Sequence, residues 1–325
     1  MIRVSFDAKR IIRGAVLLLV LLPACDRLFR VEGTDPTPIV YPDSCVSYQF
    51  DLRNLPYDSL PYTNYDSSDI IEPLEPADTA GVVYFEWQGG RYYHPVNMCQ
   101  RALVYLDLFH QNGDSSNLST ALAYVDRLLI EADHFDSALY FPYLFDYKVH
   151  KRDDAVMKAP WYSGMAQGQA LSLVTRAFEL TGDSTYLDAA NRIFISLTRL
   201  RGQWKPWVVF EDSLGCYWIE EYPTSPRPSM TLNGFIFGIY GLYDYYRLTG
   251  RDDVGTLLER SLSTVKNYLP SFRRPGKPSF YGLTFHRYSG FYHMAHIEQL
   301  RRLALISGDP FFARWANTLA SDYTE

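Results

Sequence analysis

Apolar residues recur at helical spacing in eight segments of the chain after Pro95. These segments are residues 96–109, 118–130, 165–180, 186–200, 232–248, 254–269, 297–306 and 311–319. The segments form four pairs, and the break inside each pair carries a glycine followed closely by an aspartate: Gly113, Gly182, Gly250 and Gly308. A glycine in the left-handed conformation ends a helix, and an aspartate close behind it can serve the start of the next one. The pattern predicts four helical hairpins.

The four glycines are spaced 69, 68 and 58 residues apart, which indicates a repeated unit. Antiparallel hairpins of this kind bury their inner faces by closing into an α/α barrel, or toroid, and their longer connections gather at one rim. We therefore predict a mainly α fold of this type. The long connections are residues 133–160, 201–229 and 270–290, all unusually aromatic, and the middle one predicts a small β-hairpin that turns at Asp212 to Gly215. Long ordered loops on a rigid scaffold are where a site is expected.

The chain before Pro95 does not show the helical spacing of apolar residues that follows it. Residues 26–78 are rich in Pro, Asp, Ser and Tyr without a helical period, which predicts a tether, part of it lying against the folded body. Residues 81–87 have the composition of a strand that Gly89 and Gly90 interrupt. We therefore divide the chain into a signal peptide (1–24), a tether (25–78) and one domain (79–325).

The first residues carry several basic side chains, an apolar run over residues 15–22 and then Pro23-Ala24-Cys25. The run is too short to cross about 30 Å of hydrocarbon and is typical of a secretory signal. Leu22-Pro23-Ala24-Cys25 resembles a bacterial lipobox, so Cys25 is the expected site of lipidation. We expect a protein anchored by lipid in the bacterial cell envelope, on the periplasmic or cell-surface side; the alternative is an ordinary cleaved signal.

The composition of the chain limits the classes of ligand that the protein is expected to bind. The formal net charge of −6 gives no general field for nucleic acid. Twenty-six Tyr, 19 Phe and 6 Trp favour carbohydrate, because flat aromatic faces stack on sugar rings. The remaining cysteines, Cys45, Cys99 and Cys216, lack metal-binding spacing, and a disulfide between two of them or buried free thiols both stay open.

Three stretches carry candidate chemistry. Residues 160–170 contain Gly164 and Gly168, whose spacing lets a substrate or a packed helix approach closely. Residues 220–226 begin with Glu220-Glu221-Tyr222, and two adjacent carboxylates are costly to bury unless used or paired; a solvated loop edge is the alternative.

The third stretch, residues 280–296, contains His293 and His296 at i, i+3. Structural histidines are favoured there over metal ligands because no carboxylate is near in sequence. No nucleophile elbow, P-loop, dinucleotide fingerprint or HExxH motif is present in the sequence.

At these stretches the sequence resembles the D-glucuronyl C5-epimerase family, in its C-terminal helical domain, from about Gly81 to the end. The matching blocks are Trp161 to Ala170, Glu220 to Thr224, Leu232 to Phe235 with Gly241 to Asp244, and Tyr292-His293 with His296-Ile297 and Gln299-Leu300. A weaker match contains Tyr92.

The resemblance implies inversion at C5 of hexuronic acid residues in a polysaccharide, D-glucuronate to L-iduronate, as in heparan sulfate-like glycans. One group removes the C5 proton, and another delivers a proton to the opposite face. The implied catalytic residues are Tyr222, Tyr292, Tyr281 and Glu221, with Tyr222 and Tyr292 in proton transfer. Tyr281 and Tyr92 are expected to position the uronate.

The implied substrate-binding residues are Tyr92, Tyr162, Gln167, Asn233, His286, Arg287, His293 and His296. The family usually has Asp and Arg shortly after the tyrosine that corresponds to Tyr281, whereas this chain has Gly282 and Thr284. His286 or Arg287 is therefore expected to replace the missing guanidinium.

We expect no cofactor, because enolisation needs no hydride acceptor, and no metal site, although a divalent cation on the substrate carboxylate stays open. The expected partners are a uronate-containing polysaccharide and a membrane reached through Cys25, without nucleic acid; the oligomeric state is open, a homodimer being one option.

Two alternative functions remain. One is a polysaccharide lyase or a glycoside hydrolase on the same fold, the hydrolase using Glu221 and Asp212. The other is a non-catalytic surface glycan-binding lipoprotein.

Overall fold

The computed structural model describes residues 33–66, 69 and 76–324. The expected signal peptide and Cys25 lie outside the described residues. The helices are α3 (Pro95–Asn112), α4 (Ser115–Ile130), α5 (Gly164–Thr181), α6 (Ser184–Ser196), α7 (Leu232–Thr249), α8 (Asp252–Phe272), α9 (Gly290–Ser307) and α10 (Pro310–Asp322). The mainly α fold is confirmed. In the part of the chain that the structure describes, no helix combines the length and apolar character needed to cross a membrane.

The hairpin turns follow the predicted chemistry. Gly113, Gly182, Gly250 and Gly308 each cap the end of a helix in the left-handed conformation, with φ between 62° and 70°. Asp114, Asp183 and Asp309 each accept a backbone N–H at the start of the following helix. Helix α8 differs, because Arg251 is its N-cap and Asp252 and Asp253 lie in its first turn, where carboxylates interact favourably with the helix dipole.

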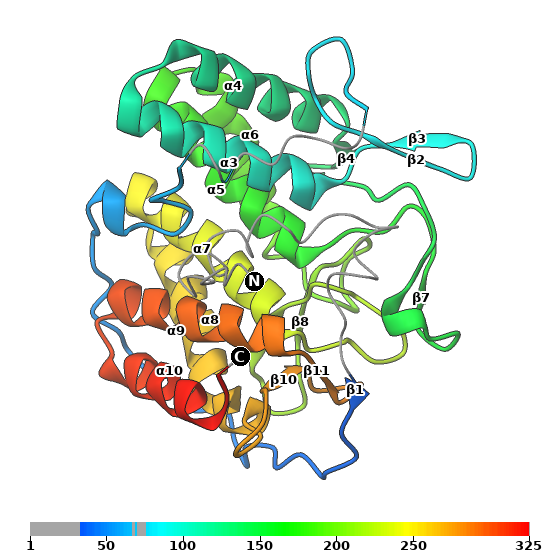
Figure 1. The fold of residues 1–325 in the computed structure, drawn as a ribbon, viewed down its shortest axis with the longest axis vertical. Helices are drawn as coiled ribbons and strands as arrows, with labels where there is room; N and C mark the ends of the chain where they lie inside the picture. Colours follow the sequence, from blue (N-terminus) through cyan, green and yellow to red (C-terminus); the bar gives the residue numbers. More distant parts are fainter. Residues whose placement is uncertain (1–32, 67–68, 70–75, 325) are drawn as a thin grey trace, which may run out of the picture.

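The helices form a row of hairpins (Figure 1). Helices α3, α5, α7 and α9 pack on one another in that order, and α4, α6, α8 and α10 each pack on their hairpin partner. The two ends of the row, α3 and α9, lie well apart in Figure 1. The repeat of hairpins is therefore present, while closure of the row into a toroid is not confirmed.

Helices α5 and α7 meet through glycines. A Cβ atom added to Gly168 would lie 2.3 Å from the Cα of Gly238, and one added to Gly241 would lie 2.1 Å from the carbonyl oxygen of Gly168. Backbone therefore packs directly on backbone at this crossing. Of the two interpretations of Gly168 in the sequence, tight helix packing is the one that the structure shows.

Short strands connect the helices. They are β1 (Gly33–Thr34), β2 (Phe85–Trp87), β3 (Gly90–Tyr92), β4 (Asp133–Phe135), β5 (Ala138–Tyr140), β6 (Tyr147–Lys148), β7 (Val156–Met157), β8 (Val209–Glu211), β9 (Tyr217–Ile219), β10 (Phe280–Gly282) and β11 (Arg287–Tyr288), with 3₁₀ turns η1 (Tyr57–Ser59) and η3 (Val149–Lys151). The predicted hairpin is β8–β9, paired antiparallel with Phe210 opposite Trp218. The Asp212 side chain accepts the N–H groups of Leu214 and Cys216, which closes its turn.

Residues 33–66, expected as part of a tether, lie against the helices. Strand β1 pairs with β11, and Leu60 is fully buried. Tyr243 of α7 accepts the N–H of Leu55 (3.0 Å) and donates to the carbonyl oxygen of Arg53 (2.8 Å). The described residues of this segment therefore belong to the folded body.

A buried ion pair binds the same segment near its C-terminal end, at Pro61 and Tyr62. Arg176 of α5 lies 3.0 Å from Asp244 of α7, and both side chains are almost fully inaccessible. The guanidinium also donates to the carbonyl oxygens of Pro61 (2.6 Å) and Tyr62 (3.4 Å). The pair thus joins two helices and the N-terminal segment at one point, and removal of either partner would leave a buried charge uncompensated.

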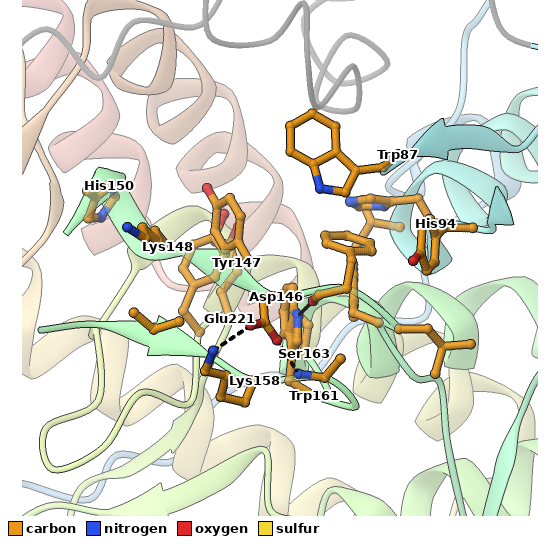
Figure 2. Close-up of a pocket in the computed structure, with 18 of the residues that line it drawn as sticks. Trp87, His94, Asp146, Tyr147, Lys148, His150, Lys158, Trp161, Ser163 and Glu221 are labelled. Atoms are coloured by element: carbon orange, nitrogen blue, oxygen red, sulfur yellow. Dashed lines mark hydrogen bonds and ion pairs between the residues drawn. The ribbon is translucent and has the colours of Figure 1, made fainter. Parts of the chain in front are cut away.

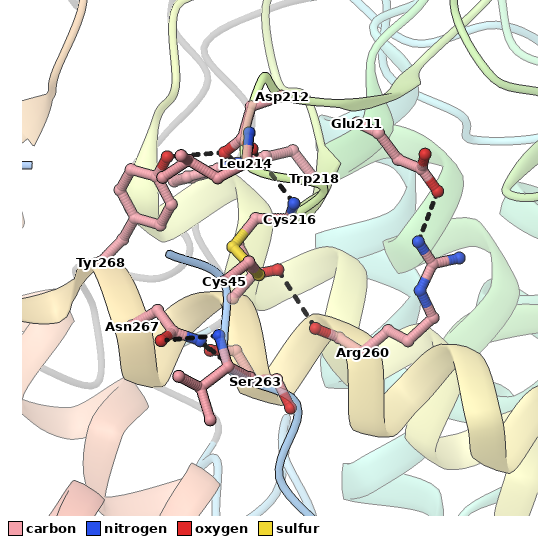
Figure 3. The surroundings of a disulfide bond; sticks show 12 residues. Cys45, Glu211, Asp212, Leu214, Cys216, Trp218, Arg260, Ser263, Asn267 and Tyr268 are labelled. Atoms are coloured by element: carbon pink, nitrogen blue, oxygen red, sulfur yellow. Dashed lines mark hydrogen bonds and ion pairs between the residues drawn. A yellow bond between two sulfur atoms is a disulfide. The ribbon is translucent and has the colours of Figure 1, made fainter. Parts of the chain in front are cut away.

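A disulfide between Cys45 and Cys216 attaches the segment to the β8–β9 hairpin (Figure 3). Asn267 of α8 holds the chain beside it, because its side chain binds both the N–H (3.2 Å) and the carbonyl oxygen (2.8 Å) of Val46. Cys99 is a buried free thiol. The sequence left the cysteine pairing open, and the structure shows a disulfide between Cys45 and Cys216.

The disulfide spans 171 residues, so its loss frees a long loop in the unfolded chain. We expect Cys45→Ser/Cys216→Ser to lower the free energy of unfolding by about 2–5 kcal/mol. Urea titrations followed by circular dichroism test this. Reductant should lower the stability of the wild type to that of the variant and leave the variant unchanged; equal midpoints for the oxidised wild type and the variant would contradict the prediction.

Candidate active site

A cleft of about 960 Å³ opens between the β2–β3 hairpin and the loops that follow β5, β9 and β10. Its lining residues are Phe85, Trp87, Gln88, Tyr92, His94, Val96, Tyr143, Leu144, Phe145, Asp146, Tyr147, Lys148, His150, Lys151, Val156, Lys158, Ala159, Trp161, Ser163, Met165, Glu221, Tyr222, Tyr281, Arg287 and Tyr292. Figure 2 shows Trp87 and His94 on one side of this cleft and Tyr147, Lys148 and His150 on the other. All four residues expected to be catalytic are among the lining residues.

A carboxyl group and three phenols meet in this cleft. The Tyr281 hydroxyl lies 3.2 Å from Oε1 of Glu221, to which it donates, and 3.4 Å from the Tyr222 hydroxyl. The rings of Tyr281 and Tyr292 pack with centroids 4.3 Å apart. Residues far apart in sequence thus form one group of side chains, which we call the Glu221 cluster (Glu221, Tyr222, Tyr281 and Tyr292). Their catalytic roles stay predictions.

Neighbouring helix ends position Glu221. Glu220 turns the chain, because its carboxylate accepts the N–H groups of Tyr222 (3.0 Å) and Met230 (2.8 Å). Its carbonyl oxygen accepts the N–H of Gly164 at the start of α5. Glu221 then lies on the first turn of α7, where a Cβ atom on Gly234 would come within 2.3 Å of Oε2. Of the two adjacent carboxylates, Glu220 holds the loop and Glu221 faces the cleft.

Burial controls the protonation of the cluster. It raises the pKa of Glu221 to about 7, against the opposing effect of hydrogen bonds from Tyr222, Tyr281 and the N–H of Gly234. Burial likewise raises the pKa of Glu220 to about 8. The pKa values of Tyr222 and Tyr281 lie well above the usual 10, through burial first and the Glu221 charge second. At neutral pH the phenols therefore keep their protons while Glu221 exchanges its own.

Oε2 of Glu221 is buried and forms no well-aligned hydrogen bond with any described residue. The N–H of Gly234 is nevertheless close enough to the carboxylate to lower its pKa. One oxygen of Glu221 is therefore held by Tyr281, and the other keeps capacity to accept a proton.

Aromatic rings form a wall beside the cluster, and of these the sequence analysis named Trp161 but not Tyr143 or Tyr147. The ring of Tyr147 stacks on that of Tyr222 at 5.7 Å and on Trp161 at 5.9 Å. Trp161 in turn stacks on Tyr143 at 3.9 Å. At the other end, Tyr92 lines the cleft as predicted, and Trp87 is 43% exposed. The aromatic character of residues 133–160 was the signal that pointed to this wall.

Basic residues also line the cleft, together with these aromatic rings. Lys148 lies in β6, Lys151 in η3 and Lys158 directly after β7, and Arg287 comes from β11. Lys148 pairs with Asp153 at 2.6 Å and Lys158 with Asp146 at 2.5 Å. Of the two residues expected to replace the family's guanidinium, Arg287 lines the cleft. His286 is not among its lining residues, and its Nδ1 lies 3.1 Å from the carbonyl oxygen of Asp35.

Several predicted substrate-binding residues lie outside the cleft. Tyr162 donates to Asp133 (2.8 Å). The Gln167 side chain binds the backbone of Leu139 and Phe141. Asn233 is fully buried in the first turn of α7. Tyr162 and Gln167 thus hold the loops around β4 and β5, a role that the sequence blocks could not separate from substrate binding.

His293 and His296 are also buried away from the cleft. Both lie within hydrogen-bond distance of the Ser279 hydroxyl through Nδ1, at 3.0 Å and 2.9 Å. Nε2 of His293 lies 3.0 Å from the carbonyl oxygen of Leu319. The prediction of substrate contact is therefore not supported for these two residues, which join β10, α9 and α10.

Asp212, considered as a partner of Glu221 in a hydrolase, is engaged elsewhere. Its Oδ2 accepts Trp218 Nε1–H (2.9 Å) and the Tyr268 hydroxyl (2.6 Å). It does not line the cleft. Among the described residues, no group of three or more His, Cys, Asp or Glu side chains is arranged to hold a metal ion.

Fold and site together define a mainly α protein with a buried carboxyl–phenol cluster in an aromatic cleft. The sequence model described as D-glucuronyl C5-epimerase C-terminus matches residues 135–321, more than half of the chain. The chain therefore belongs to this family, and the resemblance stated from the sequence is confirmed.

Individual relatives match smaller parts. A D-glucuronyl C5-epimerase of Caenorhabditis elegans is 39% identical over 93 residues, 29% of this chain and 14% of that protein. An uncharacterized protein of Methanocaldococcus jannaschii is 30% identical over 158 residues, 48% of this chain and 50% of that protein. The chain thus spans half or less of the length of these relatives.

Solved structures resemble the chain more loosely. A cellobiose 2-epimerase from Bacillus thermoamylovorans gives a TM-score of 0.49 at 14% identity, covering 69% of this chain and 59% of that one. An unsaturated glucuronyl hydrolase from Streptococcus agalactiae gives 0.46 at 17% identity, covering 70% and 57%. Likenesses of this size carry no weight for function.

The raised pKa of Glu221 has a consequence for stability. A carboxyl group whose pKa rises on folding, from 4.5 to about 7, stabilises the fold fully below pH 4.5, and this contribution is lost as the pH rises through 7. We expect Glu221→Gln, which stays neutral, to be more stable than the wild type at pH 8, by on the order of 3 kcal/mol. The difference should vanish near pH 4.5 in thermal unfolding. A variant less stable than the wild type at pH 8 would contradict the assignment.

Proposed function

We propose that this protein is a C5-epimerase of hexuronic acid residues in a polysaccharide, of the D-glucuronate to L-iduronate type. The observation that carries the proposal is the Glu221 cluster, in which a carboxyl group with a pKa of about 7 contacts a phenol inside an aromatic cleft. Membership of the family and the name of the nematode relative support the same chemistry.

Epimerisation at C5 needs a base and an acid. The C5–H bond is α to the substrate carboxylate, so its electron pair can move into that carboxylate when a base takes the proton. We propose Glu221 as the base, because its pKa lies near neutral pH. A neutral phenol, Tyr222 or Tyr292, then donates a proton to the opposite face of C5.

The hydrogen bonds within the cluster complete the cycle. After the transfer, Glu221 is protonated and Tyr222, where it is the donor, is a phenolate. The Tyr281 hydroxyl contacts both groups, 3.2 Å from Glu221 and 3.4 Å from the Tyr222 hydroxyl. A proton can therefore pass from Glu221 through the Tyr281 hydroxyl to Tyr222, which restores both groups without a cofactor.

The setting of the reaction follows the sequence analysis. We propose that Cys25 is lipidated, that the protein acts in the bacterial cell envelope, and that its row of hairpins is a segment of α/α-barrel architecture. The substrate is a uronate-containing polysaccharide. The lysines and Arg287 at the cleft complement the charge of such a polymer.

The test is proton NMR of D-glucuronate-containing polysaccharides incubated in deuterated water with protein that begins after Cys25. We expect the C5 proton signal to disappear and iduronate to form. Glu221→Gln should slow exchange at least about 100-fold, and so should Tyr222→Phe or Tyr292→Phe, whichever removes the proton donor. Tyr186→Phe is the matched control, since Tyr186 bonds to Asp126 on the outer helices.

Other products identify the alternatives. Unsaturated ends would mean a lyase, which removes the same proton but expels the C4 substituent. A polymer that binds without any exchange would leave a glycan-binding lipoprotein and refute the catalytic proposal.

The pH dependence tests the choice of base. Only ionised Glu221 can accept the C5 proton, so kcat/KM should rise with pH and level off above an apparent pKa of about 7. The neighbouring Glu220, with a pKa of about 8, broadens this limb. A profile that falls through this range would show that the base is another group.

A further inference from the structure

His150 lies in the cleft beside the Glu221 cluster. Its ring meets Tyr281 and Tyr222 edge-on, with centroids 5.6 Å and 6.4 Å apart, and Phe285 at 5.8 Å on another side. The residue belongs to η3, between β6 and β7, and faces the cleft from a different loop than the cluster (Figure 2). No sequence motif singled it out.

The imidazole has hydrogen-bonding capacity that the fold does not use. Nε2 of His150 is buried, and no described residue forms a hydrogen bond with it. His293 has hydrogen-bond partners at both ring nitrogens. Nε2 of His296 is also buried without a partner among the described residues, but His296 does not line the cleft, whereas His150 does. A buried polar atom without a partner is unfavourable, and such an atom in a cleft is suited to a ligand.

The backbone at this position is also strained. His150 has φ 54° and ψ 30°, and Lys151 after it has φ 60°, both in the left-handed region that side chains disfavour. Consecutive residues in this conformation persist only where the surrounding structure holds them. His150 thus lines the cleft in an unfavourable backbone conformation that the surrounding structure holds.

Two guanidinium groups act on His150, those of Arg287 and of Arg152, and Arg152 is paired with Asp154 at 2.6 Å. Burial, followed by the charges of Arg287 and Arg152, lowers the pKa of His150 to about 3, so the ring is neutral at neutral pH. Arg287 lines the same cleft as His150. A neutral imidazole next to guanidinium groups favours an anionic ligand that accepts its N–H.

We propose that His150 binds the C5 carboxylate of the uronate through Nε2, with Arg287 supplying positive charge beside it. The identity of the ligand rests on the proposed function. The carboxylate contact itself is a binding event and can be measured without turnover. His150 is thus a carboxylate-binding residue that sets the uronate beside Glu221.

The experiment compares an oligosaccharide containing D-glucuronate with the same oligosaccharide after reduction of its carboxylates to primary alcohols. Calorimetric titration of the wild type should show at least about tenfold tighter binding of the acid form, since hydrogen bonds to a charged group are strong. His150→Leu should weaken this preference several-fold, because the charge of Arg287 then remains without the hydrogen bond from His150. His150→Asn, which keeps an amide donor and tolerates the left-handed backbone, should restore part of it.

His134→Ala is the matched control, because His134 is an exposed histidine on β4 that contacts Arg192. It should keep the full preference for the acid form. The ¹⁵N signals of the His150 ring in the wild type provide a second readout, independent of any variant. They should shift with the acid oligosaccharide and stay in place with the reduced one.

The outcomes separate this inference from the proposed function. A weakened preference in His150→Leu without C5 exchange in the wild type would uphold the carboxylate contact and refute the epimerase. C5 exchange with an unchanged preference in His150→Leu and unmoved ¹⁵N signals would uphold the epimerase and overturn the role of His150. Equal binding of the two oligosaccharides by the wild type would also overturn it.

Discussion

The site depends on the close approach of one chain segment to two helices, at positions where the helices carry glycine. The segment from Ile219 to Glu221 runs between the first turns of α5 and α7, and a Cβ atom on Gly164 would lie 2.6 Å from Ile219 and 2.7 Å from the carbonyl oxygen of Glu220. A Cβ atom on Gly238 would meet Ile219 at 2.7 Å, and one on Gly234 would meet Glu221. Only glycines permit this approach, so the packing of two helices fixes where one carboxyl group points. The chemistry of the cleft is therefore built on a tightly packed part of the fold.

The same packing explains the properties of the cluster. Glu221 is held away from water, and burial keeps its proton available near neutral pH, while the phenols around it stay protonated. Burying the Glu221 carboxyl lowers the stability of the fold. Contacts around the loop that carries Glu221 offset this loss. Glu220 binds two backbone N–H groups, and the disulfide of Cys216 joins the preceding hairpin to the N-terminal segment. The N-terminal segment also reaches the site from the other side, since β1 extends the sheet of β10 and β11.

Sequence patterns were sufficient to predict the helical hairpins. They were insufficient to predict helix ends and side-chain positions that depend on tertiary contacts. Apolar spacing and the four glycines predicted the four helical hairpins. Helix α9 nevertheless begins at Gly290 rather than 297, because its first turns bury Tyr292, His293 and His296 instead of aliphatic residues. Helix α6 ends at Ser196 rather than 200, since Leu200 leaves it to bridge Val209. Family motifs located the Glu221 cluster, but each motif mixes residues that face the cleft with residues that support it, as His293 shows. His150 reaches the site only through the pairing of β6 with β7, which no local pattern reveals.

The central claim is that C5 of a uronate lies between Glu221 and a tyrosine of the cluster. A crystal structure of Glu221→Gln with a bound glucuronate-containing oligosaccharide tests it most directly. We predict that C5 lies about 3–3.5 Å from the amide group that replaces the Glu221 carboxyl, on one face of the ring, with the Tyr222 or Tyr292 hydroxyl at a similar distance on the opposite face. A ring stacked on Tyr147 and Trp161 with C5 directed away from the cluster would contradict this claim and leave a cleft that only binds.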